Sequence, residues 1–223
     1  MPLAKNSPGR QEAVDDPKPG DLRVATLKPI ILGRRNVVPD VSLPSKPVAA
    51  DTVLPALSFI LGGARSGKSR YAEQLIAARR RPALYLATAE ARDDEMRQRI
   101  ATHRARRGPS WTTIEEPVEI VNRLLAESDG GRPVLIDCLT LWLANLMGAN
   151  ADIGFEIERL LAVLPQLKSP VVMVANEVGL GIVPENAMAR AFRDHAGRLN
   201  QGVAALAQRV VFMAAGLPLA LKG

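Results

Sequence analysis

An octapeptide in the first third of the chain combines the residue types that bind phosphate groups. It fits the pattern G-x-x-x-x-G-K-[ST] and consists of Gly62, Gly63, Ala64, Arg65, Ser66, Gly67, Lys68 and Ser69. The glycines let successive backbone N–H groups point at phosphate oxygens. The Lys68 ammonium can then reach β- and γ-phosphates, and the Ser69 hydroxyl can ligate Mg²⁺. The pattern predicts a nucleoside triphosphate site, with an ordinary glycine-rich turn as the alternative.

A carboxylate that could complete such a site follows a short apolar run. Asp137 comes directly after residues 134–136, a pattern typical of a buried strand that ends in an acid. Beside a phosphate loop, a carboxylate in this position is a suitable ligand for Mg²⁺. The alternative is that Asp137 caps the helix expected to begin near Leu139.

The two histidines of the chain differ in their surroundings. His103 lies on the helix expected over residues 93–107, and three arginines lie on or near its face: Arg99 at i−4, Arg106 at i+3 and Arg107 at i+4. Nearby guanidinium groups favour a neutral, nucleophilic imidazole and also bind phosphates. A surface histidine on a basic helix is the alternative. His195 follows Asp194, and because adjacent residues point to different sides of a helix, we interpret His195 as structural.

The segment from Asn176 to Asn186 joins an apolar strand to a helix expected to start at Pro184. It opens with the polar pair Asn176-Glu177 and contains two glycines. Ligands of open α/β sheets gather at the carboxyl ends of the strands. The segment is therefore predicted to be a substrate or switch loop, with a plain connection as the alternative.

Short apolar runs alternate with helical patterns from residue 57 onward, which is typical of βαβ units around a parallel sheet. We expect strands at 57–61, 83–88, 134–137, 171–175 and 210–214. We expect helices at 69–80, 93–107, 117–127, 139–146, 154–164 and 185–208. This order predicts an α/β domain over residues 57–223.

Residues 1–56 differ from the rest of the chain because they hold nine of its 17 prolines and show no sustained apolar period. They are predicted to be a proline-rich, poorly ordered N-terminal extension. The longest mostly apolar stretch, residues 138–149, has 12 residues, whereas a membrane-spanning helix needs about 20. The single cysteine, Cys138, excludes an internal disulfide and favours a reducing, cytoplasmic location.

The formal net charge of +6 is compatible with two kinds of anionic partner, or with an ordinary solvated surface of mixed charge. A nucleic-acid-binding ATPase would use it, but only 4% of the residues are aromatic, and within residues 57–223 the basic clusters are confined to 79–81 and 104–107. A nucleoside triphosphate is the other partner. A generic small-molecule kinase would also bind a nucleoside triphosphate. It needs the phosphate loop but no histidine, so it remains a further alternative.

Several of these motifs occur together and in order in one known family. They are GGARSGKS at 62–69, YLATA at 85–89, DDEM at 93–96 followed by Arg99-Ile100 and His103, NEVGLGIVPEN at 176–186, and GRLNQ at 197–201. From Leu57 to the C-terminus, the chain closely resembles the bifunctional adenosylcobinamide kinase/adenosylcobinamide-phosphate guanylyltransferase family of cobalamin biosynthesis. The phosphate loop is common to many NTPases, but the later motifs are specific to this family.

The resemblance implies a P-loop NTPase fold with a RecA-like, mainly parallel sheet flanked by helices. It also implies two reactions: ATP or GTP phosphorylates adenosylcobinamide, and GTP then transfers GMP through a histidine to the phosphorylated corrinoid. The position that matches the guanylylated histidine is His103. The implied nucleotide contacts, besides the loop 62–69, are Ala87, Thr88, Ala89, Arg104, Ala105, Arg106, Arg107, Glu115 and Asp137.

The resemblance further implies a homotrimer with active sites between subunits, and Mg²⁺ held by Ser69 and Asp137. The partners implied are adenosylcobinamide, its phosphate, GTP and ATP. We expect no nucleic-acid partner and no membrane span.

Overall fold

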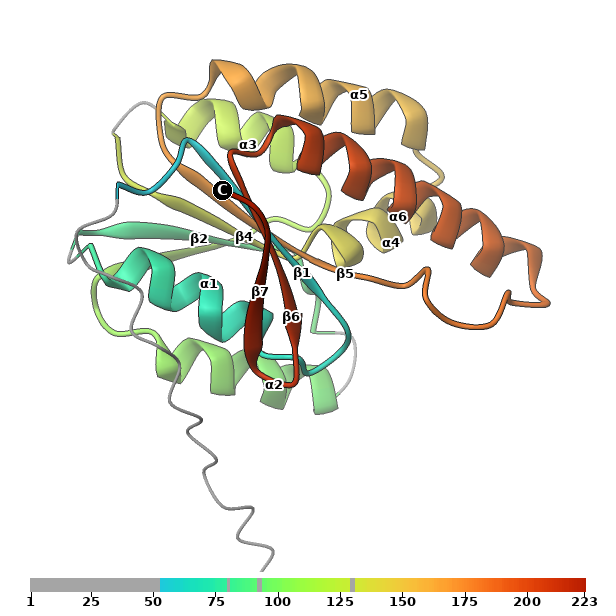
Figure 1. Ribbon diagram of the computed structural model, residues 1–223, viewed down its shortest axis with the longest axis horizontal. Coiled ribbons are helices and arrows are strands. Elements are labelled where there is room, and N and C mark those ends of the chain that lie inside the picture. Colours follow the sequence, from blue (N-terminus) through green and yellow to red (C-terminus); the bar gives the residue numbers. More distant parts are fainter. Residues whose placement is uncertain (1–52, 80, 92–93, 129–130) are drawn as a thin grey trace, which may run out of the picture. The chain divides into compact units, whose positions relative to one another are not determined.

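The computed structural model describes residues 53–79, 81–91, 94–128 and 131–223, all within the unit 42–223 of the chain. In this part, the strands form one sheet in the order β3-β2-β4-β5-β1-β6-β7 (Figure 1). The strands are β1 (Leu57–Gly62), β2 (Ala83–Ala87), β3 (Trp111–Glu115), β4 (Val134–Asp137), β5 (Val171–Asn176), β6 (Arg209–Ala214) and β7 (Leu217–Lys222). The helices are α1 (Lys68–Ala77), α2 (Asp94–Arg106), α3 (Ile120–Glu127), α4 (Leu139–Gly148), α5 (Ile153–Val163), the 3₁₀ turn η2 (Leu164–Gln166) and α6 (Ala187–Leu206).

Neighbouring strands run parallel throughout the sheet except at β6 and β7, which form an antiparallel hairpin. The central strands β1, β4 and β5 are buried along almost their whole length. Their near-continuous apolar sequences are those of strands covered on both faces. This burial explains why these three strands are recognisable from sequence.

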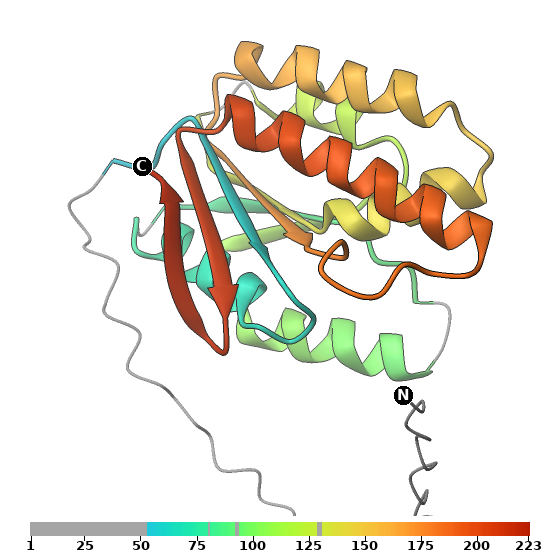
Figure 2. The same ribbon diagram turned by 45° about the vertical axis from the view of Figure 1, so that its right-hand side comes forward.

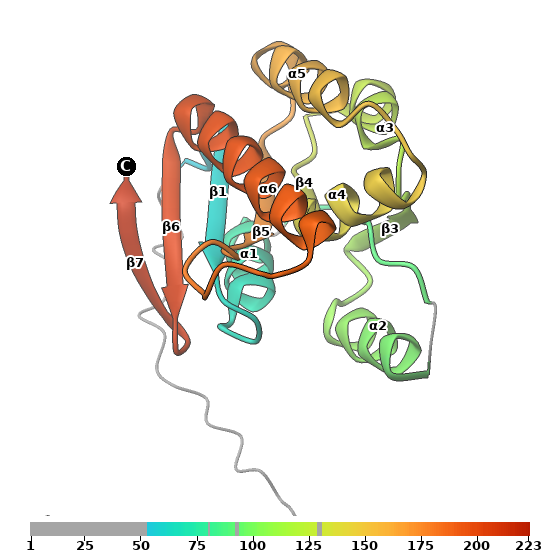
Figure 3. The same cartoon turned by 90° about the vertical axis from the view of Figure 1, so that its right-hand side faces the viewer.

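Helices cover both faces of the sheet (Figure 3). Helices α1 and α2 lie on one face, and α3, α4, α5 and α6 lie on the other (Figure 2). A hydrophobic core fills each side. Leu75 and Ile76 of α1 belong to the first core, and Trp142 of α4 and Leu199 of α6 belong to the second. The sheet is thus held between two helical layers, and its carboxyl edge is left for the loops that follow each strand.

The predicted fold class is confirmed: an α/β fold with a RecA-like, mainly parallel sheet flanked by helices. One strand, β5, separates β1, which precedes the phosphate loop, from β4, which ends at Asp137. Among the residues described, no helix has the length and hydrophobicity needed to cross a membrane.

Two strands were missed by the sequence analysis, and both lie at the edges of the sheet. Strand β3 is only partly buried, and every residue of β7 is exposed. Edge strands are not covered on both sides, so they do not need a continuous apolar run. β7 also contains Pro218, which is tolerated at an edge because its missing N–H leaves no partner strand unpaired.

Two helices begin later than expected. Helix α3 begins at Ile120 rather than at 117, because the Glu116 carboxylate accepts hydrogen bonds from the N–H groups of Val118 and Glu119, at 3.3 and 2.9 Å, and closes a turn. Helix α6 begins at Ala187, beyond both Pro184 and residue 185. The Asn186 side chain caps it by accepting from the Met188 and Ala189 N–H groups, at 2.8 and 3.2 Å.

A shortened chain that begins at Leu54 is expected to fold and to keep its activities within a few-fold. Leu54 is 7% exposed in the core beside α1, and the Ala56 carbonyl accepts from Val171 N–H at 2.8 Å, so residues 54–56 belong with the sheet. Thermal unfolding and both enzyme assays test this expectation.

The matched control is a chain that begins at Leu57 and lacks Leu54. It loses the buried Leu54 side chain, which should cost about 1.5–3 kcal/mol of stability, and also the hydrogen bond to the Ala56 carbonyl. If the chain beginning at Leu54 fails to fold, or loses most of its activity, residues 1–53 contribute to the domain and the predicted boundary is wrong.

Candidate nucleotide site

The phosphate loop connects β1 directly to α1 at the carboxyl edge of the sheet. Gly62 has φ 151°, and a Cβ there would lie 2.4 Å from the Met213 carbonyl oxygen, so no other residue fits without a shift. Gly67 has φ 97°, which is left-handed backbone that glycine adopts without strain, and it forms the N-cap of α1. The loop also receives a hydrogen bond of 3.0 Å from Gly216 N–H to the Ser66 carbonyl. The β6–β7 turn therefore supports the loop from outside.

Two polar groups of the loop are placed for an anionic ligand. Lys68 is 6% exposed, and its Nζ donates to the Gly63 carbonyl at 2.6 Å, so the ammonium is folded back over the loop. Within the described part of the chain, the buried Ser66 Oγ has no hydrogen-bond partner. Buried polar atoms are almost always satisfied, so this hydroxyl fits a site that a ligand completes. The N-terminus of α1 adds its positive dipole end to the same position.

Asp137 lies at the end of β4 on the same edge of the sheet. Parallel register pairs it with Ala87 of β2 and Val174 of β5, while Gly62 pairs with Asn176 at the end of β5. Its Oδ2 accepts a hydrogen bond of 2.9 Å from the Tyr85 hydroxyl. The cap residue of α4 is Cys138, so the alternative interpretation of Asp137 as that helix's cap is not supported.

Thr88 links the ends of β2 and β4 rather than facing outward. It is fully buried, and its hydroxyl donates to the Cys138 carbonyl at 2.7 Å and accepts from the Cys138 N–H at 2.8 Å. Its own N–H donates to the Asp137 carbonyl at 3.2 Å. The Asn145 side chain donates to the Thr88 carbonyl at 2.8 Å. Thr88, between Ala87 and Ala89, therefore holds the backbone on which Asp137 is carried.

Helix α2 and the turn after it carry the residues predicted around the histidine. The backbone of His103 lies in α2, but the side chains of His103, Arg99 and Arg106 lie outside the part of the structure that is described. Arg104 is 64% exposed, and its Nη1 lies 4.0 Å from Oε1 of Glu115 at the end of β3. This pair brings the predicted contacts on α2 and β3 together, and Ala105 is exposed beside it.

Arg107 differs sharply from Arg104 because its side chain is only 4% exposed. Its Cζ lies 3.4 Å from the centroid of the Tyr85 ring, and its Nη1 lies 3.8 Å from Glu73 Oε1 on α1. Helix spacing predicted this arginine on or near the face of His103, and this stays a prediction because the side chain of His103 lies outside the described residues. The structure directs it inward, against β2 and α1.

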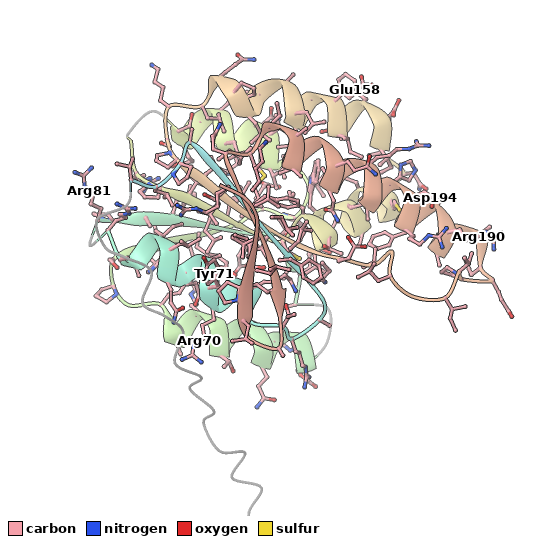
Figure 4. The ribbon with its side chains drawn as sticks, in the orientation of Figure 1. Arg70, Tyr71, Arg81, Glu158, Arg190 and Asp194 are labelled. Carbon is pink, nitrogen blue, oxygen red and sulfur yellow. The ribbon has the colours of Figure 1, made fainter. Side chains whose placement is uncertain are left out.

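The loop that follows β5 starts at the phosphate loop and then runs outward. Its first residue, Glu177, donates its N–H to the Gly62 carbonyl at 3.1 Å. Farther along, three apolar side chains are exposed: Leu180, Ile182 and Val183, with Ile182 98% exposed. Beyond this loop, His195 lies half-buried on α6. Its neighbour Asp194, which is labelled in Figure 4, pairs with Arg193 at 3.3 Å.

Tyr85 and Glu73 are residues of this region that sequence reasoning missed. Tyr85 is buried inside the apolar run of β2. Burial and then the Asp137 carboxylate raise the pKa of its hydroxyl far above the ordinary value, so the group stays protonated and acts as a donor. A signal was available: a tyrosine in a buried strand normally has a partner for its hydroxyl.

Cys138 is expected to resist thiol reagents while the protein is folded. Burial, and then the Asp137 carboxylate, raise the pKa of its thiol to about 11 from 9.0. At neutral pH this lowers the reactive thiolate fraction about a hundredfold. The chain has one cysteine, so the rate of labelling by a chromogenic disulfide at pH 8 reports this group alone.

The denatured protein is the control and should react at the rate of a free cysteine. As the pH rises toward 11, labelling of the folded protein should accelerate with the thiolate fraction. Fast labelling of the folded protein at pH 8 would contradict the burial of this thiol.

A glycine loop between the first strand and helix of a mainly parallel sheet, with a carboxylate two strands away, defines a P-loop NTPase. Residues 58–221 match the family described as cobinamide kinase / cobinamide phosphate guanyltransferase. The chain belongs to this family.

Curated relatives agree with this membership. The chain is 49% identical over 167 residues to the bifunctional adenosylcobalamin biosynthesis protein CobP of Pseudomonas aeruginosa, a match that covers 74% of this chain and 96% of the relative. It is 40% identical over 179 residues to the bifunctional adenosylcobalamin biosynthesis protein CobU of Escherichia coli, covering 74% and 98%. Among solved structures, the flagellar accessory protein FlaH of Methanocaldococcus jannaschii gives a TM-score of 0.44 at 14% identity, covering 78% of this chain and 81% of that one.

Proposed function

We propose that this protein phosphorylates adenosylcobinamide with ATP or GTP and then converts the product to adenosylcobinamide-GDP by transfer of GMP from GTP. Its membership of the kinase and guanyltransferase family supports both steps. The observation that carries the proposal is the loop from Gly62 to Ser69 with Lys68 folded over it, at the edge of the sheet that also bears Asp137. Neither the generic kinase nor the nucleic-acid-binding ATPase is favoured.

In the kinase step, the hydroxyl oxygen of the corrinoid's aminopropanol arm forms a bond to the γ-phosphorus. The bond from that phosphorus to the bridging oxygen breaks, the nucleoside diphosphate leaves, and the hydroxyl proton passes to solvent. The backbone N–H groups of the loop and the N-terminus of α1 would bind the phosphates. Lys68 would exchange its bond to the Gly63 carbonyl for the β- and γ-phosphate oxygens.

Mg²⁺ fits the oxygen donors of this edge. Ser69 supplies a hydroxyl at the start of α1, and Asp137 supplies the carboxylate oxygen that Tyr85 does not occupy. Among the described residues, no group of three or more metal-binding side chains occurs, and Mg²⁺ on a nucleotide usually takes only one or two protein ligands besides phosphates and water. When bound, the ion would neutralise charge on the β- and γ-phosphate oxygens.

In the guanylyltransferase step, a ring nitrogen of His103 would attack the α-phosphorus of GTP and release pyrophosphate. A phosphate oxygen of adenosylcobinamide phosphate would then attack the same phosphorus, which frees the histidine and forms the diphosphate linkage. Arg104 and Arg106 on α2, with Glu115 opposite, are proposed to contact the nucleotide. Cationic groups there would stabilise charge on the α-phosphate and keep the imidazole neutral.

The remaining proposals concern the setting of the enzyme. We propose a homotrimer, and the exposed apolar side chains at Leu180, Ile182 and Val183 support a contact of that loop with another molecule. Light scattering would measure the oligomeric mass. We also propose a cytoplasmic enzyme that does not bind nucleic acid. Cell fractionation and a gel-shift assay would test these two points.

The decisive experiment combines the purified protein with GTP radiolabelled at the α-phosphate. Label should stay on the denatured protein, be released by mild acid, and be chased into a corrinoid product when adenosylcobinamide phosphate is added. A protein that phosphorylates adenosylcobinamide but never retains label would be a kinase only, and the second half of the proposal would fail.

A further inference from the structure

A buried chain of four side chains connects the phosphate-loop helix to the carboxylate at the end of β4. Glu73 of α1 faces Arg107, Arg107 lies over the Tyr85 ring of β2, and Tyr85 donates to Asp137. The first contact is 3.8 Å, the second is 3.4 Å to the ring centroid, and the third is a hydrogen bond of 2.9 Å. We call these four residues the Glu73–Asp137 relay.

Arg107 is an unusual member because its guanidinium is buried without full hydrogen bonding. In the described part of the chain, its Nε and Nη1 have no hydrogen-bond partner. Its charge makes a cation–π contact with the Tyr85 ring and an ion pair with Glu73. A planar guanidinium stacked on an aromatic ring fixes that ring in place. Trp111 adds an edge-to-face contact on the same ring, with centroids 6.3 Å apart.

The Tyr85 hydroxyl has a use that the ring alone does not explain. A phenylalanine would fill the same space in β2, and it would avoid burying a polar group. The hydroxyl instead fixes Oδ2 of Asp137, which leaves Oδ1 as the oxygen available to a cation. Partners of this kind orient metal-binding carboxylates and affect the metal's affinity.

We propose that Tyr85 is a positioning residue for the Asp137 carboxylate, and that Arg107 acts on the carboxylate by holding the Tyr85 ring. The proposal rests on the proposed role of Asp137 as a Mg²⁺ ligand. It assigns Arg107 a task that differs from a direct nucleotide contact. Arg107 lies in the turn that follows α2, the helix that carries His103. The proposal therefore also connects this turn to the Asp137 carboxylate.

The test measures Mg²⁺ binding without turnover. A fluorescent GTP analogue is bound to the protein in EDTA, and its affinity is then followed as Mg²⁺ is added. In Tyr85→Phe, the half-saturating Mg²⁺ concentration should rise about tenfold. Removing the hydrogen-bond partner of a metal ligand typically lowers the affinity for the metal by about that factor. Affinity for the analogue in EDTA should stay within twofold of the wild type.

Tyr71→Phe is the matched control, since Tyr71 is the other tyrosine of the chain. It lies on α1, where it is half-buried (Figure 4). No change in the Mg²⁺ response is expected for this variant. If the half-saturating Mg²⁺ concentration rose as much in Tyr71→Phe, loss of either tyrosine hydroxyl would disturb the domain in general, and the positioning role would be withdrawn.

Arg107→Lys keeps the charge but loses the planar stacking, so it tests the other half of the proposal. It should shift the Mg²⁺ response in the same direction as Tyr85→Phe. In the double variant the shift should equal that of Tyr85→Phe alone, because Arg107 acts through Tyr85. If the two shifts in half-saturating Mg²⁺ concentration added in the double variant, Arg107 would act independently of Tyr85, and the proposal that it acts through the Tyr85 ring would be wrong.

Asp137→Asn separates failure of this inference from failure of the metal proposal. If Asp137→Asn leaves the Mg²⁺ response unchanged, Asp137 is not the metal ligand and the premise is wrong. If Asp137→Asn abolishes the response while Tyr85→Phe leaves it intact, the ligand role stands and Tyr85 has no positioning role.

Discussion

His103→Ala is expected to abolish covalent labelling by GTP and formation of adenosylcobinamide-GDP, while kinase activity remains measurable. A phosphoramidate needs a neutral nitrogen nucleophile that attacks the α-phosphorus, and the imidazole of His103 is the nitrogen predicted to do so. Phosphoryl transfer to the acceptor hydroxyl instead needs positioned phosphates and no covalent step on the enzyme. The measurement pairs a denaturing gel for label with a coupled assay of nucleoside diphosphate release.

Two further variants make this result specific. His103→Asn keeps a polar group that can contact phosphate, and it should also lose the label. His195→Ala is the matched control at the chain's other histidine, and it should keep both activities. Label that survives at position 103 but disappears in His195→Ala would reverse the assignment, and label that resists mild acid would exclude a phosphoramidate at either histidine.

Lys68→Ala is expected to reduce kinase turnover by a factor of about 10² to 10³. That factor corresponds to about 3–4 kcal/mol of lost transition-state stabilisation. Lys68 is the cation of the phosphate loop that is buried at the start of α1, with its Nζ 2.6 Å from the Gly63 carbonyl. Without it, only the backbone N–H groups of the loop and the N-terminus of α1 would remain to stabilise charge that develops on the β- and γ-phosphate oxygens. Steady-state kinetics with ATP and adenosylcobinamide measure the effect.

Lys168→Ala is a suitable control because Lys168 is exposed, in the connection between η2 and β5. Thermal unfolding of both variants shows whether the Lys68 substitution merely destabilises the loop. A folded Lys68→Ala protein with near-normal kinase turnover would contradict the role assigned to the phosphate loop.

Part of the site is readable from sequence because its residues are close together along the chain. The octapeptide from Gly62 to Ser69 carries its own geometry, since the left-handed Gly67 and the following helix are local properties. The strand ending at Asp137 is recognisable because β4 is buried on both faces and needs an apolar run. The same local reasoning identified His103 as a candidate nucleophile, and this remains a prediction.

Other features were decided by tertiary contacts. Strands β3 and β7 pair with the edges that β2 and β6 offer them. The sequence of β3, WTTIE, lacks the apolar run of a central strand, whereas β7, LPLALK, is mostly apolar but exposed and interrupted by Pro218. The contacts of Arg107 with Tyr85 and Glu73 are another case, because helix spacing gives no indication of them and the turn after α2 brings the side chain there. The hydrogen bond between Tyr85 and Asp137 joins residues 52 positions apart.

The physical reason is the range of the interactions involved. Glycine conformation, helix capping and strand burial act over a few residues, so they leave patterns in the sequence. The partner of a buried hydroxyl or guanidinium is set by which strands become neighbours, and here β2 and β4 are neighbours although α2, β3 and α3 separate them along the chain. Sequence was therefore enough to predict the phosphate loop and the carboxylate at the end of β4, whereas only the folded sheet shows that the Tyr85 hydroxyl donates a hydrogen bond to that carboxylate.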